Sequence, residues 1–253
     1  MRHLFIIGIG AGHPDYITIQ AVKALNLVDI FFFMNKGDSK DELVRLRKDI
    51  CERYIEHHPY RIVESVDPIR DESIPDYKTR VQQWHLERVQ IYEDLIANEL
   101  SEDATGAFLI WGDPSLYDST LRIIDQIVAR ANVPFTYDVI PGITSPQALA
   151  ARHRIPLHDI GESILITTGR HLASGKPIEP ENILVMLDGH AAYKDIPDQQ
   201  TQIYWGAYLG MENEILLSGT LEETAPKIEA ARAEARERNG WIMDTYLLSK
   251  PAN

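Results

Sequence analysis

The chain has 253 residues, of which 44% are hydrophobic and 25% are charged, close to the averages of soluble globular proteins. It carries 38 acidic and 25 basic residues, a formal net charge of −13, which excludes nucleic acid as a favoured partner because phosphates would be repelled. The sequence contains no apolar run of about 18 residues that could span a membrane, and its start does not match a signal peptide. We therefore expect a cytoplasmic protein without a membrane partner.

The first part of the chain alternates apolar runs with helical patterns. Strands are expected at 4–7, 30–33, 61–63, 108–110 and 135–140, and helices at 19–28, 38–54, 76–100 and 121–128. This alternation predicts a parallel sheet with helical crossovers, and we assign residues 1–141 to an N-terminal α/β domain. The helix over 76–100, which carries Trp84 and Leu86, is long enough to pack one face on the sheet.

The pattern changes after Pro146. Closely spaced strands are expected at 164–166, 183–186, 202–208, 214–217 and 242–248, with one charged helix at 221–238. This predicts a mixed α+β domain over residues 142–253. Residues 161–180 are rich in loop formers and are expected to form a flexible connection.

The single cysteine, Cys51, cannot form an internal disulfide and lies in a helical pattern, so we expect a buried, unreactive thiol and a reducing compartment. Among the histidines, the close pairs are His57 with His58 and His153 with His158. Neither pair matches the metal-binding signature H-E-x-x-H, so we expect structural or surface roles and no metal site.

A glycine-rich loop over residues 8–12 follows the first strand and suggests a dinucleotide-binding turn. The spacing does not fit, because His13 stands where the third glycine belongs and Asp29 precedes the second strand instead of ending it. A nicotinamide or flavin cofactor is therefore disfavoured. Thr18 is a plausible helix N-cap, and Asp15 could share that capping role or serve the function.

Two further loops, at 112–117 and 141–146, follow the strands at 108–110 and 135–140. The carboxyl ends of parallel strands meet at one edge of the sheet, where ligands bind in open α/β folds. Each loop alone is a common Gly/Pro turn. The three loops together predict a binding site at this edge.

In this order and spacing, the motifs at 8–12, 17–18, 112–115, 141–148 and 155–157 resemble those of the tetrapyrrole methylase family, the class III S-adenosylmethionine methyltransferases. The resemblance covers nearly the whole chain. It implies a two-domain α/β fold, an N-terminal parallel-sheet domain and a C-terminal mixed α+β domain, with the ligand cleft between them, and it favours a homodimer. The first loop departs from the family's usual pattern at Ala11 and His13, which puts the contacts expected there in doubt.

The resemblance also implies S-adenosyl-L-methionine as cofactor and S-adenosyl-L-homocysteine as product. The residues that it implies for cofactor binding lie on strand-end loops of both domains: Gly112, Asp113, Leu116, Thr144, Ser145, Met186 and Ala207. Local alternatives stay open, because Asp113 could cap its own turn and Met186 could pack in the core.

The long runs at 28–53 and 111–123 are similar to the deacetylating, C-methylating members of the family in cobalamin biosynthesis. The implied substrate is precorrin-5, methylated at ring carbon 1 with release of acetate. Removal of the acetyl group requires a group that accepts a proton from water. His13, Asp15 and Tyr117 are the candidates, and the sequence does not choose among them.

Carboxylates of such a substrate would need cations, and Lys36, Arg170 and Lys176 are the loop candidates. The basic run at 45–48 is instead typical of a solvated helix face. Alternatives within the family are enzymes like diphthine synthase, which act on a modified histidine of a translation factor, and rRNA methyltransferases. A protein that binds S-adenosylmethionine without catalysis is a further alternative.

Overall fold

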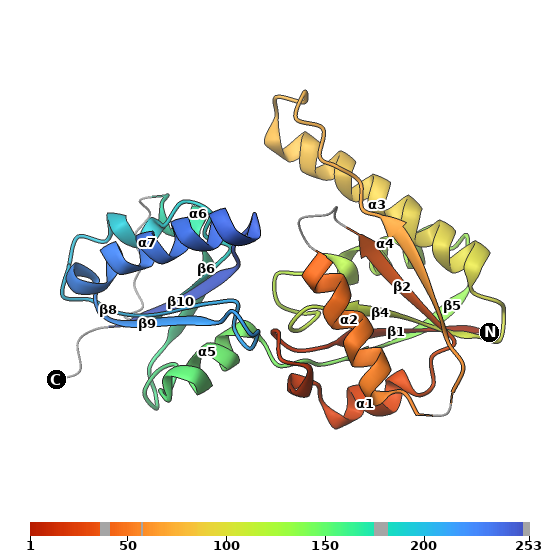
Figure 1. The fold of residues 1–253 in the computed structure, drawn as a ribbon. Coiled ribbons are helices and arrows are strands. Elements are labelled where there is room, and N and C mark those ends of the chain that lie inside the picture. The colour runs from red at the N-terminus through yellow and green to blue at the C-terminus, as the bar shows by residue number, and fades with distance from the viewer. Residues whose placement is uncertain (36–40, 57, 175–181, 250–253) are drawn as a thin grey trace. The chain divides into compact units, whose positions relative to one another are not determined.

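The computed structural model describes residues 1–35, 41–56, 58–174 and 182–249 (Figure 1). The chain divides into a first unit, Met1–Gly10 with Pro14–Ile143, and a second unit, Ala11–His13 with Thr144–Asn253. Ala11 and Gly12 of the first glycine loop, with His13 directly after it, thus group with the second unit, which the sequence pattern does not predict.

The first unit is built on a five-stranded parallel sheet with the order β3-β2-β4-β1-β5. Its strands are β1 (Arg2–Gly8), β2 (Ile30–Asn35), β3 (Arg61–Val66), β4 (Thr105–Ile110) and β5 (Phe135–Ile140). Its helices are the 3-10 turn η1 (Pro14–Tyr16), α1 (Ile19–Leu25), α2 (Asp41–Tyr54), α3 (Tyr77–Glu99) and α4 (Thr120–Arg130). The predicted parallel sheet is confirmed, and residues 38–40 of the expected second helix lie outside the described residues.

Helices cover both faces of this sheet, because its central strands are apolar on both sides. Side chains from α3 and α4 pack with alternate residues of β1, β2 and β4 in one core cluster. Side chains from α1 and α2 pack on the opposite face, where Cys51 is fully buried. The expectation of a buried thiol is therefore confirmed, and burial raises the pKa of Cys51 to about 12, which disfavours the reactive thiolate.

Helix α3 buries only its C-terminal half. Its N-cap is Asp76, whose carboxylate accepts a hydrogen bond from the backbone N–H of Thr79 at 2.8 Å. Val89 and Tyr92 are buried, whereas Leu86 is 53% exposed. The first half of the helix projects beyond the sheet (Figure 1). The expectation that the helix packs on the sheet is therefore wrong for its first half.

The second unit contains a five-stranded mixed sheet with the order β6-β7-β10-β8-β9, in which only β6 and β7 are parallel. Its strands are β6 (Ile164–Thr168), β7 (Asn182–Met186), β8 (Gln202–Ala207), β9 (Ile215–Thr220) and β10 (Asp244–Ser249). Its helices are α5 (Ser145–His153), α6 (Gly169–Leu172), the 3-10 turn η3 (Ala192–Asp195) and α7 (Leu221–Asn239). The predicted mixed α+β pattern is confirmed.

Within the segment at 161–180, the strand expected at 164–166 is confirmed, whereas the helix that follows it was not expected and corrects the expectation of a flexible connection there. β6 pairs with β7 throughout its length, and α6 follows it directly, with Thr168 as its N-cap. A Cβ atom on Gly169 would lie 2.3 Å from the carboxylate of Asp188, so only glycine fits this close contact. This long-range contact leaves little signal in the local sequence.

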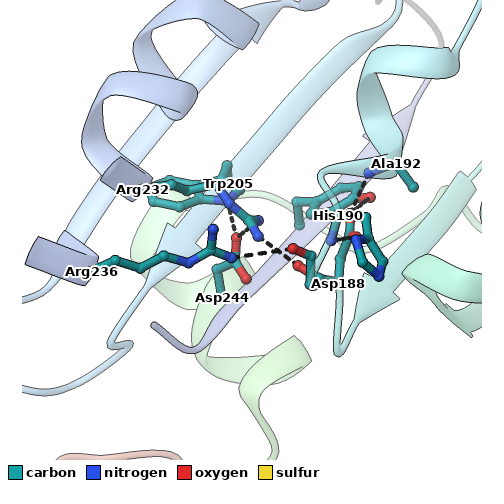
Figure 2. A network of polar contacts seen from close by, with 9 residues as sticks. Asp188, His190, Ala192, Trp205, Arg232, Arg236 and Asp244 are labelled. Atoms are coloured by element: carbon teal, nitrogen blue, oxygen red, sulfur yellow. Dashed lines mark hydrogen bonds and ion pairs between the residues drawn. The ribbon is translucent and has the colours of Figure 1, made fainter. Parts of the chain in front are cut away.

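A buried polar network joins α7 to the sheet of the second unit (Figure 2). Arg232 pairs with the carboxylate of Asp244 and donates to the backbone oxygen of Asp188 at 2.7 Å. Trp205 also donates to Asp244, at 2.8 Å, and Tyr246 donates to the Asp188 carboxylate at 2.7 Å. Burial raises the pKa of Asp244, and the guanidinium of Arg232 opposes that rise. Each charge in this network therefore depends on its partner.

None of the described helices combines the length and the apolar character that crossing a membrane requires.

Candidate functional site

Glycines bring three strand ends of the first unit into backbone contact. A Cβ on Gly142 would lie 2.1 Å from the carbonyl oxygen of Gly112, and a Cβ on Gly8 would lie 2.6 Å from the nitrogen of Gly142. Gly10 and Gly112 exchange two backbone hydrogen bonds, of 2.8 and 3.2 Å. The loops after β1, β4 and β5 therefore meet at the carboxyl edge of the sheet, and only glycine allows this approach.

Asp113 ties two of these loops together. One carboxylate oxygen accepts from the backbone N–H of Gly142 at 2.8 Å. The other accepts from the backbone N–H of Ser115 at 2.8 Å and from its hydroxyl group. Burial raises the pKa of Asp113, but these hydrogen bonds outweigh burial and leave the pKa below its ordinary value. Asp113 does cap its own turn, and it also holds the loop after β5.

Space remains beside Gly112. Its φ of +70° lies in the left-handed region, and a Cβ built there would meet no atom within 4 Å. The glycine is required by the backbone conformation and not by crowding. A ligand can therefore approach the main chain at this position.

The three catalytic candidates differ in their surroundings. The exposed carboxylate of Asp15 accepts a hydrogen bond from the hydroxyl of Tyr54 at 2.7 Å, while Thr18 is the residue that caps α1. Tyr117 lies on the loop after β4 and is 43% exposed. His13 is exposed and groups with the second unit.

In the second unit, Thr144 is the N-cap of α5. Its hydroxyl accepts from the backbone N–H of Gln147, and the Gln147 side chain accepts from the backbone N–H of Thr144 at 2.8 Å. This reciprocal capping box fixes the start of the helix. Substitution of Thr144 would therefore change the helix terminus as well as any ligand contact.

Four residues gather at one end of the second sheet around Thr245. Its hydroxyl donates to that of Ser145 at 3.2 Å, and in the sheet it pairs with Met186 on one side and Gly206 on the other. Ala207 follows Gly206 and is fully buried, whereas Met186 is partly buried. The expected residues Ser145, Met186 and Ala207 thus share one sheet end, and sequence reasoning missed Thr245.

Within the second unit, Gly12 packs closely against the segment that follows β8. A Cβ on Gly12 would lie 2.2 Å from the carbonyl oxygen of Leu209, two residues beyond the end of β8 at Ala207. Ala11 is buried. The departure from the family pattern at Ala11 therefore lies in a packed segment, where a small side chain fits.

Directly after three of the residues implied for cofactor binding, the next residue has a strained, left-handed backbone conformation. Tyr117, Leu187 and Tyr208 have φ values of 53°, 54° and 50°, and each directly follows a residue implied for cofactor binding. Non-glycine residues in this region cost on the order of 1 kcal/mol each and gather at functional sites. Ala131, Arg154 and Ala191 have similar φ values at helix ends, so the strain favours a functional role at the three positions without being confined to them.

The basic run at 45–48 is not a uniformly solvated face, which corrects the expectation. Lys48 pairs with Glu64 at 2.7 Å. Arg47 is partly buried, and its Nε donates to the carbonyl oxygen of Leu109 at 3.0 Å. Of the cations expected to bind the substrate, Lys36 and Lys176 lie outside the described residues, and Arg170 is exposed on α6.

Two further expectations can be checked. Asp29 accepts from the backbone N–H of Thr105 at 2.8 Å, at the amino end of β2, which confirms that it cannot serve as the ribose-binding acid of a dinucleotide fold. His153 donates to the carbonyl oxygen of Trp205 at 3.0 Å, a structural role. Within the described residues, no group of three or more His, Cys, Asp or Glu side chains is placed to hold a metal ion.

A family model described as Tetrapyrrole (Corrin/Porphyrin) Methylases matches residues 3–225. The chain belongs to this family. Among its relatives, a precorrin-6A synthase [deacetylating] of Sinorhizobium sp is 49% identical over 253 residues, which cover 100% of this chain and 97% of that protein. The crystal structure of a protein from Corynebacterium diphtheriae described as related to cobalamin synthesis (CobF) matches with a TM-score of 0.85 and 37% identity, covering 99% of both chains.

A third tetrapyrrole methylase shares the fold at low identity. The uroporphyrin-III C-methyltransferase of Thermus thermophilus, solved in complex with S-adenosylhomocysteine, matches with a TM-score of 0.56 and 16% identity, covering 98% of this chain and 92% of that chain. The two-unit architecture is thus that of the family.

Proposed function

We propose that this chain is a precorrin-6A synthase of the deacetylating type. It transfers a methyl group from S-adenosyl-L-methionine to ring carbon 1 of precorrin-5 and releases the acetyl group as acetate. The observation that carries this proposal is the 49% identity with the Sinorhizobium enzyme, which extends over the whole of this chain.

The residues present fit S-adenosylmethionine. The cofactor supplies a methyl group made electrophilic by a sulfonium, so the protein must chiefly hold it in position and exclude water. We assign its binding to residues at the strand ends of both units: Gly112, Asp113, Leu116, Thr144, Ser145, Met186 and Ala207. The open space beside Gly112 and the strained turns after Leu116, Met186 and Ala207 support this assignment.

Positioning is the main catalytic contribution expected of this chain. Orientation of two reactants can lower a barrier by about 7–11 kcal/mol when the reacting atoms are held in line. The backbone contacts among Gly8, Gly112 and Gly142 leave little freedom at the carboxyl edge of the first sheet. A rigid edge of this kind suits a reaction that needs alignment more than acid or base groups.

The two halves of the reaction can share one electron pair. Water adds to the acetyl carbonyl, and cleavage of the bond between the acetyl carbon and ring carbon 1 releases acetate. The pair from that bond stays on the ring carbon, which then forms its bond to the incoming methyl group. Both protons of the water are released, one as its oxygen adds to the acetyl carbon and one as the acetic acid formed ionises to acetate, and the protein or the solvent must accept them.

Tyr117 is better suited to donate a hydrogen bond than to act as the base. Partial burial raises the pKa of its phenol above the ordinary value, so it stays protonated at neutral pH. We propose that Tyr117 donates to the acetyl carbonyl oxygen and that His13 or Asp15 accepts the proton from water. Replacement of His13 and Asp15 by Gln and Asn separates the two, because only the loss of the base should abolish acetate release.

The direct test is incubation of the purified protein with S-adenosylmethionine and precorrin-5, with the products followed by mass spectrometry. We expect a methylated, deacetylated macrocycle together with free acetate and S-adenosylhomocysteine. Binding of S-adenosylhomocysteine, measured by calorimetry, without turnover would support a non-catalytic binding protein instead.

We also propose that the protein is a homodimer, on the basis of its family likeness. A native mass spectrum that gives only the 28.8 kDa species would contradict this.

A further inference from the structure

The first sheet opens between β2 and β4 at its carboxyl edge. The pairing of β2 with β4 ends at Phe32 and Phe108. Beyond that point β2 continues along β3 as far as Asn35, and β4 continues along β1 as far as Ile110. β2 and β4 thus stop pairing with each other at the edge where ligands bind in folds of this type.

The side chain of Arg47, from α2, lies at this opening. Its Nε donates to the carbonyl oxygen of Leu109, one residue beyond the last pair between the two strands, at 3.0 Å. Its Nη1 donates to the carbonyl oxygen of Leu43 at 3.2 Å. The guanidinium is therefore fixed beside Leu109, three residues before Gly112.

The charge of Arg47 is not compensated. No carboxylate among the described residues forms an ion pair with it, and burial lowers its pKa. Asp118 acts on it only from beyond ion-pair distance, and its carboxylate accepts from the backbone N–H of Thr120 at 2.6 Å. In contrast, the buried Arg88 and Arg232 each have a carboxylate partner. Arg47 is only partly buried, so solvent also stabilises its charge, but its guanidinium has no counter-ion and can therefore bind an anionic ligand.

One nitrogen of this guanidinium remains for such a ligand. Among the described residues, none accepts a hydrogen bond from Nη2 of Arg47. This nitrogen is also not fully buried. The fork geometry of a guanidinium matches a carboxylate.

The position of Arg47 separates it from the glycine contacts. Gly8, Gly112 and Gly142 lie on the β1 and β5 side of β4, whereas Arg47 lies on the β2 side. We propose that Arg47 binds a carboxylate at the rim of the tetrapyrrole substrate and thereby orients the macrocycle. This proposal rests on the proposed function, because it takes precorrin-5 as the substrate.

The test compares Arg47→Met, Arg47→Lys and the control Arg45→Met, which removes an exposed cation from the same helix. Equilibrium binding of precorrin-5 is measured in the presence of S-adenosylhomocysteine, so that the result does not depend on turnover. We expect Arg47→Met to weaken precorrin-5 binding by about tenfold or more, Arg47→Lys to restore part of it, and Arg45→Met to change it by less than about twofold.

Cofactor affinity identifies the source of the carboxylate. S-adenosylhomocysteine carries an amino-acid carboxylate, and methylthioadenosine lacks it. We expect both to bind Arg47→Met as they bind the wild type. If Arg47→Met binds S-adenosylhomocysteine more weakly but methylthioadenosine as before, Arg47 binds the cofactor carboxylate and the proposal is wrong. Unchanged binding of precorrin-5 would also overturn the proposal. If Arg47→Met weakens precorrin-5 binding as expected but the wild type does not convert precorrin-5, the proposed function is wrong and the proposed role of Arg47 in binding is supported.

Arg47→Met also removes the bond to Leu109, which could disturb the fold. Thermal unfolding of the three variants controls for this. A loss of precorrin-5 binding in Arg47→Lys as large as in Arg47→Met, with equally lowered melting temperatures, would show a structural role only and overturn the proposal.

Discussion

The carboxylate of Asp113 accepts a hydrogen bond from the backbone N–H of Gly142 at 2.8 Å, and this bond joins the loop after β4 to the loop after β5. The same carboxylate holds the turn at Ser115. Both loops carry residues that we assign to the cofactor, so the side chain of Asp113 acts as a brace for the proposed site whether or not it touches the ligand.

Asp113→Ala should weaken S-adenosylhomocysteine binding by about tenfold, because it leaves the N–H of Gly142 without its acceptor and loosens the two loops. Calorimetry measures this. Asp94→Ala removes an exposed carboxylate on α3 and serves as the control. If Asp113→Ala keeps the affinity of the wild type, the brace does not support the site.

Gly112→Ala and Gly240→Ala form a matched pair. Both glycines have left-handed φ values, +70° and +73°, and neither has an atom within 4 Å of a built Cβ. Each substitution should cost about 1 kcal/mol of unfolding free energy through backbone strain. Only Gly112→Ala should also lower the affinity for S-adenosylhomocysteine, because its methyl group enters the space assigned to the cofactor. Equal affinities in the two variants would place the cofactor elsewhere.

Arg232→Met should destabilise the second unit by about 3–5 kcal/mol in urea unfolding, because it leaves the carboxylate of Asp244 buried without a counter-charge. The double variant Arg232→Met with Asp244→Asn should lose less than the single one. Arg236→Ala is the control, since Arg236 lies exposed on the same helix and donates to the carbonyl oxygen of Gly189 at 3.2 Å. A double variant less stable than the single one would show that the pair is not coupled in this way.

The stability of the protein should fall on mild acidification, partly through His153. Burial lowers the pKa of His153 from its ordinary value of 6.5, and the bond to Trp205 and the charge of Glu214 only partly oppose this. The unfolded chain therefore binds a proton at His153 more readily than the folded chain. Its contribution to stability is present above the unfolded pKa and is lost as the pH falls towards the folded pKa.

We expect His153→Gln to lose less unfolding free energy than the wild type between about pH 7.5 and about pH 5.5. Burial also lowers the pKa of His85. His85 is present in both proteins, so its contribution to the pH dependence of stability cancels in the comparison. An equal loss in the two proteins would mean that His153 is not held neutral by its surroundings.

Local patterns predicted the strands of both sheets and most helices, because apolar periodicity is a property of neighbouring residues. Three features could not be predicted in this way. The contact of Gly169 with Asp188, the meeting of Thr245 with Ser145, and the opening at which Arg47 lies all depend on which strands become neighbours. Strand order is not local, so the sequence pattern shows Arg47 only as a cation on a polar helix.

The candidate site was predictable to a similar degree. The family resemblance implied residues at the strand ends. In one unit the structure places Gly112 and Asp113 in contact with the loops after β1 and β5, and in the other it brings Ser145, Met186 and Ala207 to one end of the sheet. The strained turns at Tyr117, Leu187 and Tyr208 gave no sequence signal, because their residue types are not those that favour the left-handed region.

The most direct measurement is the ratio of acetate released to methyl groups transferred, with ¹³C-methyl-labelled S-adenosylmethionine and precorrin-5 followed by NMR. The account predicts equimolar acetate and a single labelled methyl group on a saturated ring carbon. A labelled methyl group without acetate, or acetate without methyl transfer, would contradict the mechanism in which the electron pair of the cleaved bond forms the bond to the methyl group, and with it the proposed reaction.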